Sequence, residues 1–203
     1  MTQYNTVADD ATITKTKEAL EMNGFAVTIA ANGDEAKKTA LDLIPKGAEV
    51  MTMTSQTLKA LGLDTILNES GEYDAVRTKL NAMYGDASKK RDARKLGAAP
   101  DYAIGSVHAI TQDGHALIAS AGGSQLPGYV YGAGRVIWIV GAQKIVADID
   151  EARTRLREHV FPLEDARAQQ AYGIHSSINY EVLYNKEPAG RVHVIIVKES
   201  LGF

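Results

Sequence analysis

The chain alternates between two spacings of apolar residues, one that suits helices and one that suits strands. In the first half, polar segments with helically spaced apolar residues alternate with short apolar runs. Gly24 can end the first helix, and Asn32 or Asp34 can cap the second. The pattern predicts, in order, a helix over 12–23, a strand over 25–30, a helix ending near Ile44, a strand over 49–53 and a short helix through Leu61.

The second half begins with a polar segment and ends with several apolar runs. Residues 72–96 predict two helices that break near Gly85, with a solvated face formed by the basic side chains Lys89, Lys90, Arg91, Arg94 and Lys95. The continuous apolar run 135–140 predicts a strand that is buried on both faces. The remaining expected elements are a helix from Asp148 or Asp150 to Val160, a helix beginning near Leu163, and strands around 179–184 and 191–197.

A hairpin is predicted between these regions. Asp113-Gly114 stands between two apolar, partly alternating runs, and this dipeptide is typical of a two-residue hairpin turn. Such a turn would pair Ile110 with Leu117. Because strands and helices alternate early and a hairpin follows, the pattern predicts a single α/β domain with a mixed sheet over residues 1–203, its N-terminal helix starting at about residue 12.

The composition narrows the classes of protein that fit. The chain has 22 basic and 25 acidic residues and a net charge of −3, which argues against a nucleic-acid binder with a clustered basic surface. It has no cysteine, so this chain cannot itself hold a disulfide or a cysteine-ligated iron–sulfur cluster. No signal peptide is evident at the N-terminus, and no apolar run approaches the length of a membrane span. A soluble cytoplasmic protein is therefore expected.

Three groups of residues could contact a small ligand. A loop of small residues, 119–128, follows the hairpin, and its backbone amides can form a concave anion site. Hydroxyl groups follow the strand over 49–53, and ligands of α/β sheets bind at the carboxyl ends of strands. Charged groups come from the segment 162–167 and from a lysine after the 135–140 strand. The candidate ligand-binding residues are Thr54, Ser55, Thr57, Ser106, His108, Ser120, Ser124, Gln125, Lys144, Glu164 and Arg167.

Each candidate also has a structural interpretation, and the sequence leaves both open. Thr54 or Ser55 can simply cap the helix that follows. His108, which would share a hairpin face with Ser106, can be a buried histidine with a satisfied hydrogen bond rather than a general base. Glu164 can stabilise the first turn of a helix through its charge.

Several familiar active sites are not favoured by the sequence. It has no Gly-x-Ser-x-Gly turn and no identifiable acid partner for a serine–histidine pair. No Gly-x-Gly-x-x-Gly motif follows a strand, which argues against an intrinsic nicotinamide-dependent dehydrogenase. The histidines show no metal-ligand spacing, and His108 and His115 would stand roughly 13 Å apart along their strands. No metal site is therefore expected.

Two segments carry a resemblance to a known family. Residues 101–114 read Asp-Tyr-Ala-Ile-Gly-Ser-Val-His-Ala-Ile-Thr-x-Asp-Gly, and residues 118–129 read Ile-Ala-Ser-Ala-Gly-Gly-Ser-Gln-Leu-Pro-Gly-Tyr. In these motifs the chain resembles the LUD domain of the lactate-utilisation protein C type. Further segments fit the same family: 50–58, 136–146, 162–167 and 201–203.

The resemblance implies a fold similar to the sugar-phosphate isomerase and CoA-transferase group. It also implies partners, namely iron–sulfur or flavin-containing subunits of lactate oxidation. We therefore expect a protein of lactate or organic-acid utilisation that is accessory to an oxidising complex, has an anion-accepting cleft and binds no cofactor itself. The alternative is an enzyme that acts on a phosphorylated or CoA-linked small metabolite, by analogy of fold. Whether the chain forms a homo-oligomer stays open.

Overall fold

The fold is built on two β-sheets that share a hydrophobic core. The computed structural model describes residues 3–187 and 190–203. The larger sheet is parallel, and its strands in spatial order are β1 (Ala26–Ala30), β10 (Val192–Val197), β7 (Arg135–Gly141), β4 (Tyr102–Gly105), β2 (Glu49–Thr52) and β3 (Asp74–Ala75). The smaller sheet consists of β8 (Ile145–Val146), β5 (Ala109–Thr111), β6 (Ala116–Ser120) and β9 (Tyr180–Tyr184).

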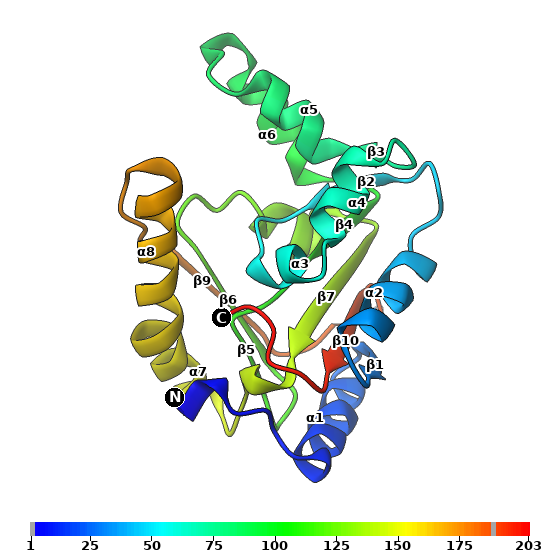
Figure 1. The fold of residues 1–203 in the computed structure, drawn as a ribbon, viewed down its shortest axis with the longest axis vertical. Coiled ribbons are helices and arrows are strands. Elements are labelled where there is room, and N and C mark those ends of the chain that lie inside the picture. The colour runs from blue at the N-terminus through cyan, green and yellow to red at the C-terminus, as the bar shows by residue number, and fades with distance from the viewer. Residues whose placement is uncertain (1–2, 188–189) are drawn as a thin grey trace.

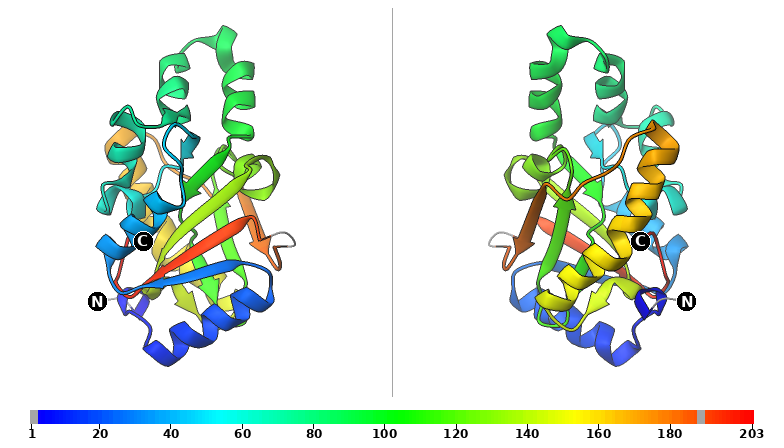
Figure 2. Two further views of the ribbon diagram at one scale, coloured as in Figure 1. Left: turned by 90° about the vertical axis from the view of Figure 1, so that its right-hand side faces the viewer. Right: turned by 90° about the vertical axis from the view of Figure 1, so that its left-hand side faces the viewer.

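Helices cover the outer faces of both sheets (Figures 1 and 2). The helices are α1 (Asp10–Met22), α2 (Gly33–Asp42), α3 (Gln56–Ala60), α4 (Leu63–Glu69), α5 (Val76–Met83), α6 (Lys90–Ala98), α7 (Ile149–Arg155) and α8 (Phe161–Tyr172). α2, α3 and α4 share one core with the larger sheet, whereas α7 packs on the outer face of the smaller sheet. α5 and α6 project beyond the sheets as a helical arm (Figure 2). Among the described residues, no helix has both the length and the apolar character to cross a membrane.

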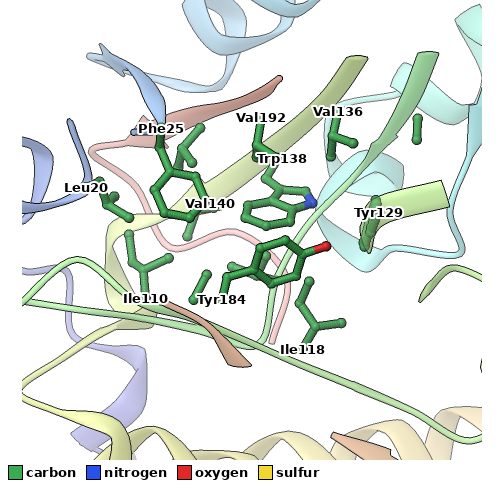
Figure 3. Packing of buried hydrophobic residues seen from close by; sticks show 14 of the residues in the cluster. Leu20, Phe25, Ile110, Ile118, Tyr129, Val136, Trp138, Val140, Tyr184 and Val192 are labelled. Carbon is green, nitrogen blue, oxygen red and sulfur yellow. The ribbon is translucent and has the colours of Figure 1, made fainter. Parts of the chain in front are cut away.

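The central strand β7 is buried on both faces, as its continuous apolar sequence predicts. Its side chains alternate, so Trp138 points into the core between the two sheets while Ile139 points to the core beneath α2 to α4. Trp138 lies against the rings of Phe25, Tyr129 and Tyr184 (Figure 3). This core fixes the two sheets relative to each other.

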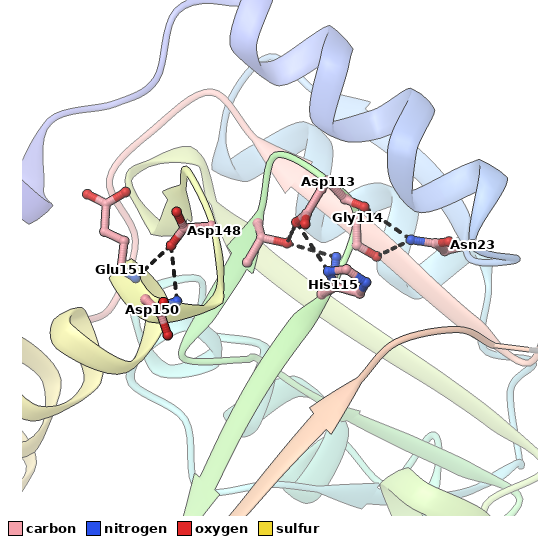
Figure 4. Close-up of polar contacts among 8 residues, drawn as sticks. Asn23, Asp113, Gly114, His115, Asp148, Asp150 and Glu151 are labelled. Carbon is pink, nitrogen blue, oxygen red and sulfur yellow. Dashed lines mark hydrogen bonds and ion pairs between the residues drawn. The ribbon is translucent and has the colours of Figure 1, made fainter.

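Most predicted elements are confirmed close to their predicted bounds. The first helix begins two residues earlier than predicted because the Asp9 carboxylate accepts a hydrogen bond from the N–H of Thr12 at 2.7 Å and caps it. Asn32 caps α2 by the same kind of contact. Asp148 caps α7 in this way too, as Figure 4 shows. The predicted break near Gly85 separates α5 from α6. Helix α4 and the short strand β3 were not predicted.

The hairpin lies where the sequence predicts it, but the predicted register was wrong by one residue. Ile110 pairs with Ala116 rather than with Leu117. The turn has three residues and ends at Gly114, whose φ is +86° and whose N–H donates to the carbonyl of Thr111 at 2.9 Å. Three-residue hairpin turns place a left-handed residue at this position, and an Asp-Gly dipeptide fits both turn lengths.

The predicted mixed sheet is divided between two sheets. β4 ends at Gly105 within the parallel sheet, and the chain then crosses through residues 106–108 to β5 in the smaller sheet. Only the smaller sheet combines parallel and antiparallel pairs. The alternating pattern over 102–112 does not reveal this crossing, because both pieces are extended and buried.

The helix predicted to begin near Leu163 is α8, which begins at Phe161, but no break in the helical segment precedes it. α7 continues through a widened turn, Leu156–Val160, directly into α8. Pro162 has no N–H to donate to the preceding turn, and a widened turn accommodates that loss without ending the helix. Glu164 therefore lies within a continuous helical segment, and its charge does not stabilise a free helix N-terminus.

Candidate functional site

Several chain segments meet at the carboxyl ends of the central parallel strands. β2, β4 and β7 are neighbours that run in the same direction, so the residues after them emerge at one edge of the sheet. Together with the loop after β6 and helix α8, they line a cavity of about 360 Å³, here called the cleft. The structure places every candidate residue in its lining: Thr54, Ser55, Thr57, Ser106, His108, Ser120, Ser124, Gln125, Lys144, Glu164 and Arg167.

The crossing between the two sheets presents Ser106 to the cleft. Gly105 precedes it at the end of β4, and a Cβ on Gly105 would lie 2.0 Å from the hydroxyl oxygen of Tyr129. No side chain fits at Gly105 without displacing this buried ring. Ser106 is half-buried and lines the cleft, and its hydroxyl oxygen accepts from Lys144 Nζ at 3.1 Å.

Lys144 is a titratable group of the cleft although the residue is only 2% exposed. Its Nζ lies 3.2 Å from Thr57 Oγ1, 3.1 Å from Ser106 Oγ and 3.4 Å from the carbonyl oxygen of Val107. Within the described residues it has no carboxylate partner. Burial, followed by the positive charge of Arg155, lowers the pKa of this amine from 10.5 to about 7. Both protonation states of Lys144 are therefore populated near neutral pH.

Arg155 supplies a fixed positive charge behind the cleft. Its side chain is fully buried, and Nη1 donates to the carbonyl of His108. Two further nitrogens, Nε and Nη2, are buried without a hydrogen-bond partner in the described part of the chain. Burial lowers the pKa of Arg155 to about 10. The sequence held a signal for this residue, because Arg155 shares the helical spacing of the buried Ala152 and Leu156.

His108 is held in one neutral form. Its Nδ1 accepts a hydrogen bond from the N–H of Ala119 at 3.0 Å, so the proton of the neutral ring is on Nε2. Burial, and then the charges of Lys144 and Arg155, lower the pKa of His108 to about 3. At neutral pH this histidine can offer an N–H to the cleft, which favours a hydrogen-bond donor over a general base.

The loop of small residues is closed by its own side chains. Ser120 donates to Gln125 Oε1 at 2.8 Å and accepts from the N–H of Gly123 at 2.8 Å. The polar groups of Ser120 and Gln125 therefore form hydrogen bonds within the loop. In the described structure, by contrast, Gly122 and Ser124 make no hydrogen bond, so their backbone N–H groups and the Ser124 hydroxyl are available to a ligand.

The hydroxyl cluster after β2 has divided roles. Ser55 accepts from the N–H of Leu58 at 3.3 Å and caps α3, which confirms the capping alternative for this residue. Thr57 is buried and donates to the carbonyl of Leu201 at 3.2 Å. Thr54 is exposed at the rim and makes no hydrogen bond with the described residues.

The charged groups of α8 bind each other. Arg167 donates through Nε and Nη2 to the two carboxylate oxygens of Glu164, both at 2.6 Å. This bidentate pair occupies the geometry that Arg167 would otherwise offer to a ligand carboxylate. Arg167, a candidate ligand-binding residue, is thus paired with Glu164 in this structure, and both side chains line the cleft.

Arg77 is a lining residue that the sequence did not single out. It follows the unpredicted strand β3 and lies at the start of α5. Its Nε and Nη2 donate to the carbonyl of Thr52 at 3.1 and 2.8 Å, and Nη1 has no hydrogen-bond partner among the described residues. Arg77 could not be distinguished in the polar segment 72–96, because most basic residues of that segment lie on the exposed arm.

Comparisons with known proteins agree with this description of the fold. No curated protein matches the chain. A crystal structure of a DUF162 family protein from Deinococcus radiodurans is similar, with a TM-score of 0.54 and 11% sequence identity over 95% of this chain and 99% of that one. The described residues contain no cluster of histidine or acidic side chains that could hold a metal ion. The family model of the LUD domain matches residues 13–197, and the chain therefore belongs to the LUD domain family.

Proposed function

We propose that the cleft binds a small carboxylate of the class to which lactate belongs. The chain would serve organic-acid utilisation as an accessory subunit of an oxidising complex in the cytoplasm. The LUD family is associated with lactate utilisation, and this association gives the class of ligand. The main observation in support is that the cleft has more basic than acidic side chains.

Three basic side chains and one acidic side chain line the cleft: Arg77, Lys144, Arg167 and Glu164. Since Glu164 binds Arg167, the other two basic groups have no carboxylate partner within the described chain. Half-buried and buried cations are costly without a partner, so a bound anion stabilises them. The approach of a carboxylate also favours the protonated form of Lys144.

The variant Arg77→Met tests this assignment. Removing a charged hydrogen-bond donor should weaken lactate binding by at least about tenfold, since such bonds contribute about 1.5–3 kcal/mol. Isothermal titration calorimetry with lactate, pyruvate and inorganic phosphate measures the dissociation constants. Arg94→Met, an exposed residue of the arm outside the cleft, is the matched control and should bind as the wild type does. Equal weakening in both variants, or no binding of any of the three anions, would refute the proposal.

The accessory role makes a second prediction. The purified chain should contain neither iron nor flavin in stoichiometric amount, because it has no cysteine for a cluster and no dinucleotide motif. Elemental analysis for iron and the visible absorption spectrum of freshly purified protein measure this. A stoichiometric chromophore would contradict the expectation that redox centres reside on partner subunits.

A second candidate function is an enzyme that acts on a phosphorylated or CoA-linked metabolite. The contact between Ser106 and Lys144 favours it, because the pair combines a hydroxyl nucleophile with an amine of lowered pKa. The proposed kinship with the sugar-phosphate isomerase and CoA-transferase group rests on analogy of fold and on the position of the cleft at the strand ends. The chemistry of the pair itself is more specific than that analogy.

A further inference from the structure

We infer that Ser106 and Lys144 form a nucleophile–base pair that cleaves an ester or thioester of a small carboxylic acid. The inference names a mechanism for the second candidate function. It rests on the proposed function in one respect, because the product of the reaction is a small carboxylate that the same cleft would hold.

The hydrogen bonds around Lys144 orient the pair. A neutral amine has two N–H groups and one lone pair. Thr57 gives its own proton to the carbonyl of Leu201, so its Oγ1 accepts one N–H of Lys144 at 3.2 Å. The carbonyl of Val107, at 3.4 Å, can only accept and takes the second. In the structure Nζ donates to Ser106 Oγ at 3.1 Å, and the Ser106 hydroxyl donates to the carbonyl of Val107 at 3.4 Å. When the amine is neutral, rotation of this hydroxyl turns its proton toward the lone pair of Nζ, which can then receive it.

Exposure decides which member of the pair meets the substrate. Ser106 is half-buried and lines the cleft, whereas Lys144 is 2% exposed and has hydroxyl groups on two sides. Direct attack by the amine on a carbonyl carbon would require those hydroxyls to move. A base that acts through Ser106 needs no access of its own. His108 makes no hydrogen bond to Ser106, and its Nδ1 is already occupied.

The reaction balances with water as the only co-reactant. Ser106 Oγ attacks the acyl carbon while its proton passes to Lys144 Nζ, and a tetrahedral intermediate forms. The carbon–sulfur or carbon–oxygen bond then breaks, and Lys144 returns the proton to the leaving thiolate or alkoxide. Water attacks the acyl-serine by the same route, which releases the carboxylate and restores the hydroxyl. The free N–H groups of Gly122 and Ser124 line the same cavity and are available to the carbonyl oxygen.

The charges around the pair determine its pH dependence. The groups that face Lys144 are Arg155 of α7, His108 of the crossing and His159 of the widened turn. Burial lowers the pKa of both histidines from 6.5, so they are neutral at and above neutral pH, while Arg155 stays charged. Lys144 is therefore the group that titrates near pH 7. Because the neutral amine is the base, the rate should rise as the pH increases through about 7.

Hydrolysis assays on the full chain test the pair directly. The probes are p-nitrophenyl acetate and acetyl-CoA, which distinguish an oxygen ester from a CoA thioester, and a fluorophosphonate identifies the nucleophile by mass spectrometry. Ser106→Ala should lose both the label and at least about 100-fold in rate, and Lys144→Met should lose at least about 100-fold. Full activity or labelling in Ser106→Ala would overturn the inference.

A cysteine substitution tests the pair without altering Lys144. The chain has no cysteine, so iodoacetamide reports only on the introduced thiol. In S106C, the neighbouring ammonium should stabilise the thiolate and move the midpoint of alkylation at least about one pH unit below the ordinary thiol pKa of about 8.5. S70C, at an exposed serine outside the cleft, is the matched control and should titrate as an ordinary thiol. Identical profiles for the two variants would refute the contact.

The outcomes separate this inference from the proposed function. Lactate binding by calorimetry without hydrolysis of either probe would refute the pair and leave the carboxylate site standing. Hydrolysis that depends on Ser106 without lactate binding would support the pair and refute that site. Borohydride trapping of pyruvate on Lys144 would show an amine nucleophile instead and overturn the inference.

Discussion

Replacing Gly114 by valine is expected to destabilise the fold by about 2–5 kcal/mol, because it combines an unfavourable backbone conformation with an overpacked site. Gly114 has φ +86°, a region that a β-branched residue resists. A Cβ there would also lie 2.4 Å from the carbonyl oxygen of Ala19 in α1. Asn23, whose Nδ2 donates to the carbonyls of Asp113 and Gly114, would lose this contact as well (Figure 4). Chemical denaturation of both proteins measures the difference in unfolding free energy.

Gly71→Val separates the two causes. Gly71 has φ +76°, but nothing lies within 4 Å of a Cβ built on it. Its substitution should therefore cost only the backbone term, about 1–2 kcal/mol. If both valine variants lose the same free energy, the hairpin turn does not pack tightly against α1.

Replacing Trp138 by alanine is expected to cost about 3–5 kcal/mol through the cavity it leaves. The indole is fully buried, and its ring centroid lies 4.9 Å from that of Tyr184 and 5.6 Å from that of Tyr129, both in edge-to-face arrangements (Figure 3). Because Trp138 packs between the sheets, the variant should also loosen the contact between them. The denaturation midpoint and the amide hydrogen exchange of the strands in the two sheets measure these two effects.

Trp138→Phe is the matched control for this cavity. Phenylalanine keeps an aromatic ring and removes the indole N–H, which has no hydrogen-bond partner in the described residues. The loss of an unpaired buried donor offsets part of the lost packing. We expect this variant to lose less than half of the free energy lost by Trp138→Ala. An equal loss would mean that the full indole shape, rather than the presence of an aromatic ring, stabilises the core.

The sequence was informative wherever a short stretch of chain determines the structure. The caps Asn32 and Asp148 satisfy free backbone amides within three residues of themselves, so their roles are readable locally. The apolar residues 136–140 predict a doubly buried strand because a strand with one solvated face would show polar residues at alternate positions. The candidate residues line one cleft because most of them follow strands, and parallel strands end at the same edge.

The tertiary structure alone decided what each polar group is free to do. Glu164 accepts the hydrogen bonds of Arg167, and Gln125 accepts the hydrogen bond of Ser120. The sequence pattern does not predict the geometry of these contacts. The lowered pKa of Lys144 depends on burial, which comes from elements distant in sequence that pack around it. Local chemistry thus determined the helices, the strands and the residues at their ends. Burial and hydrogen bonding decided which of those residues can act, because both depend on the whole folded chain.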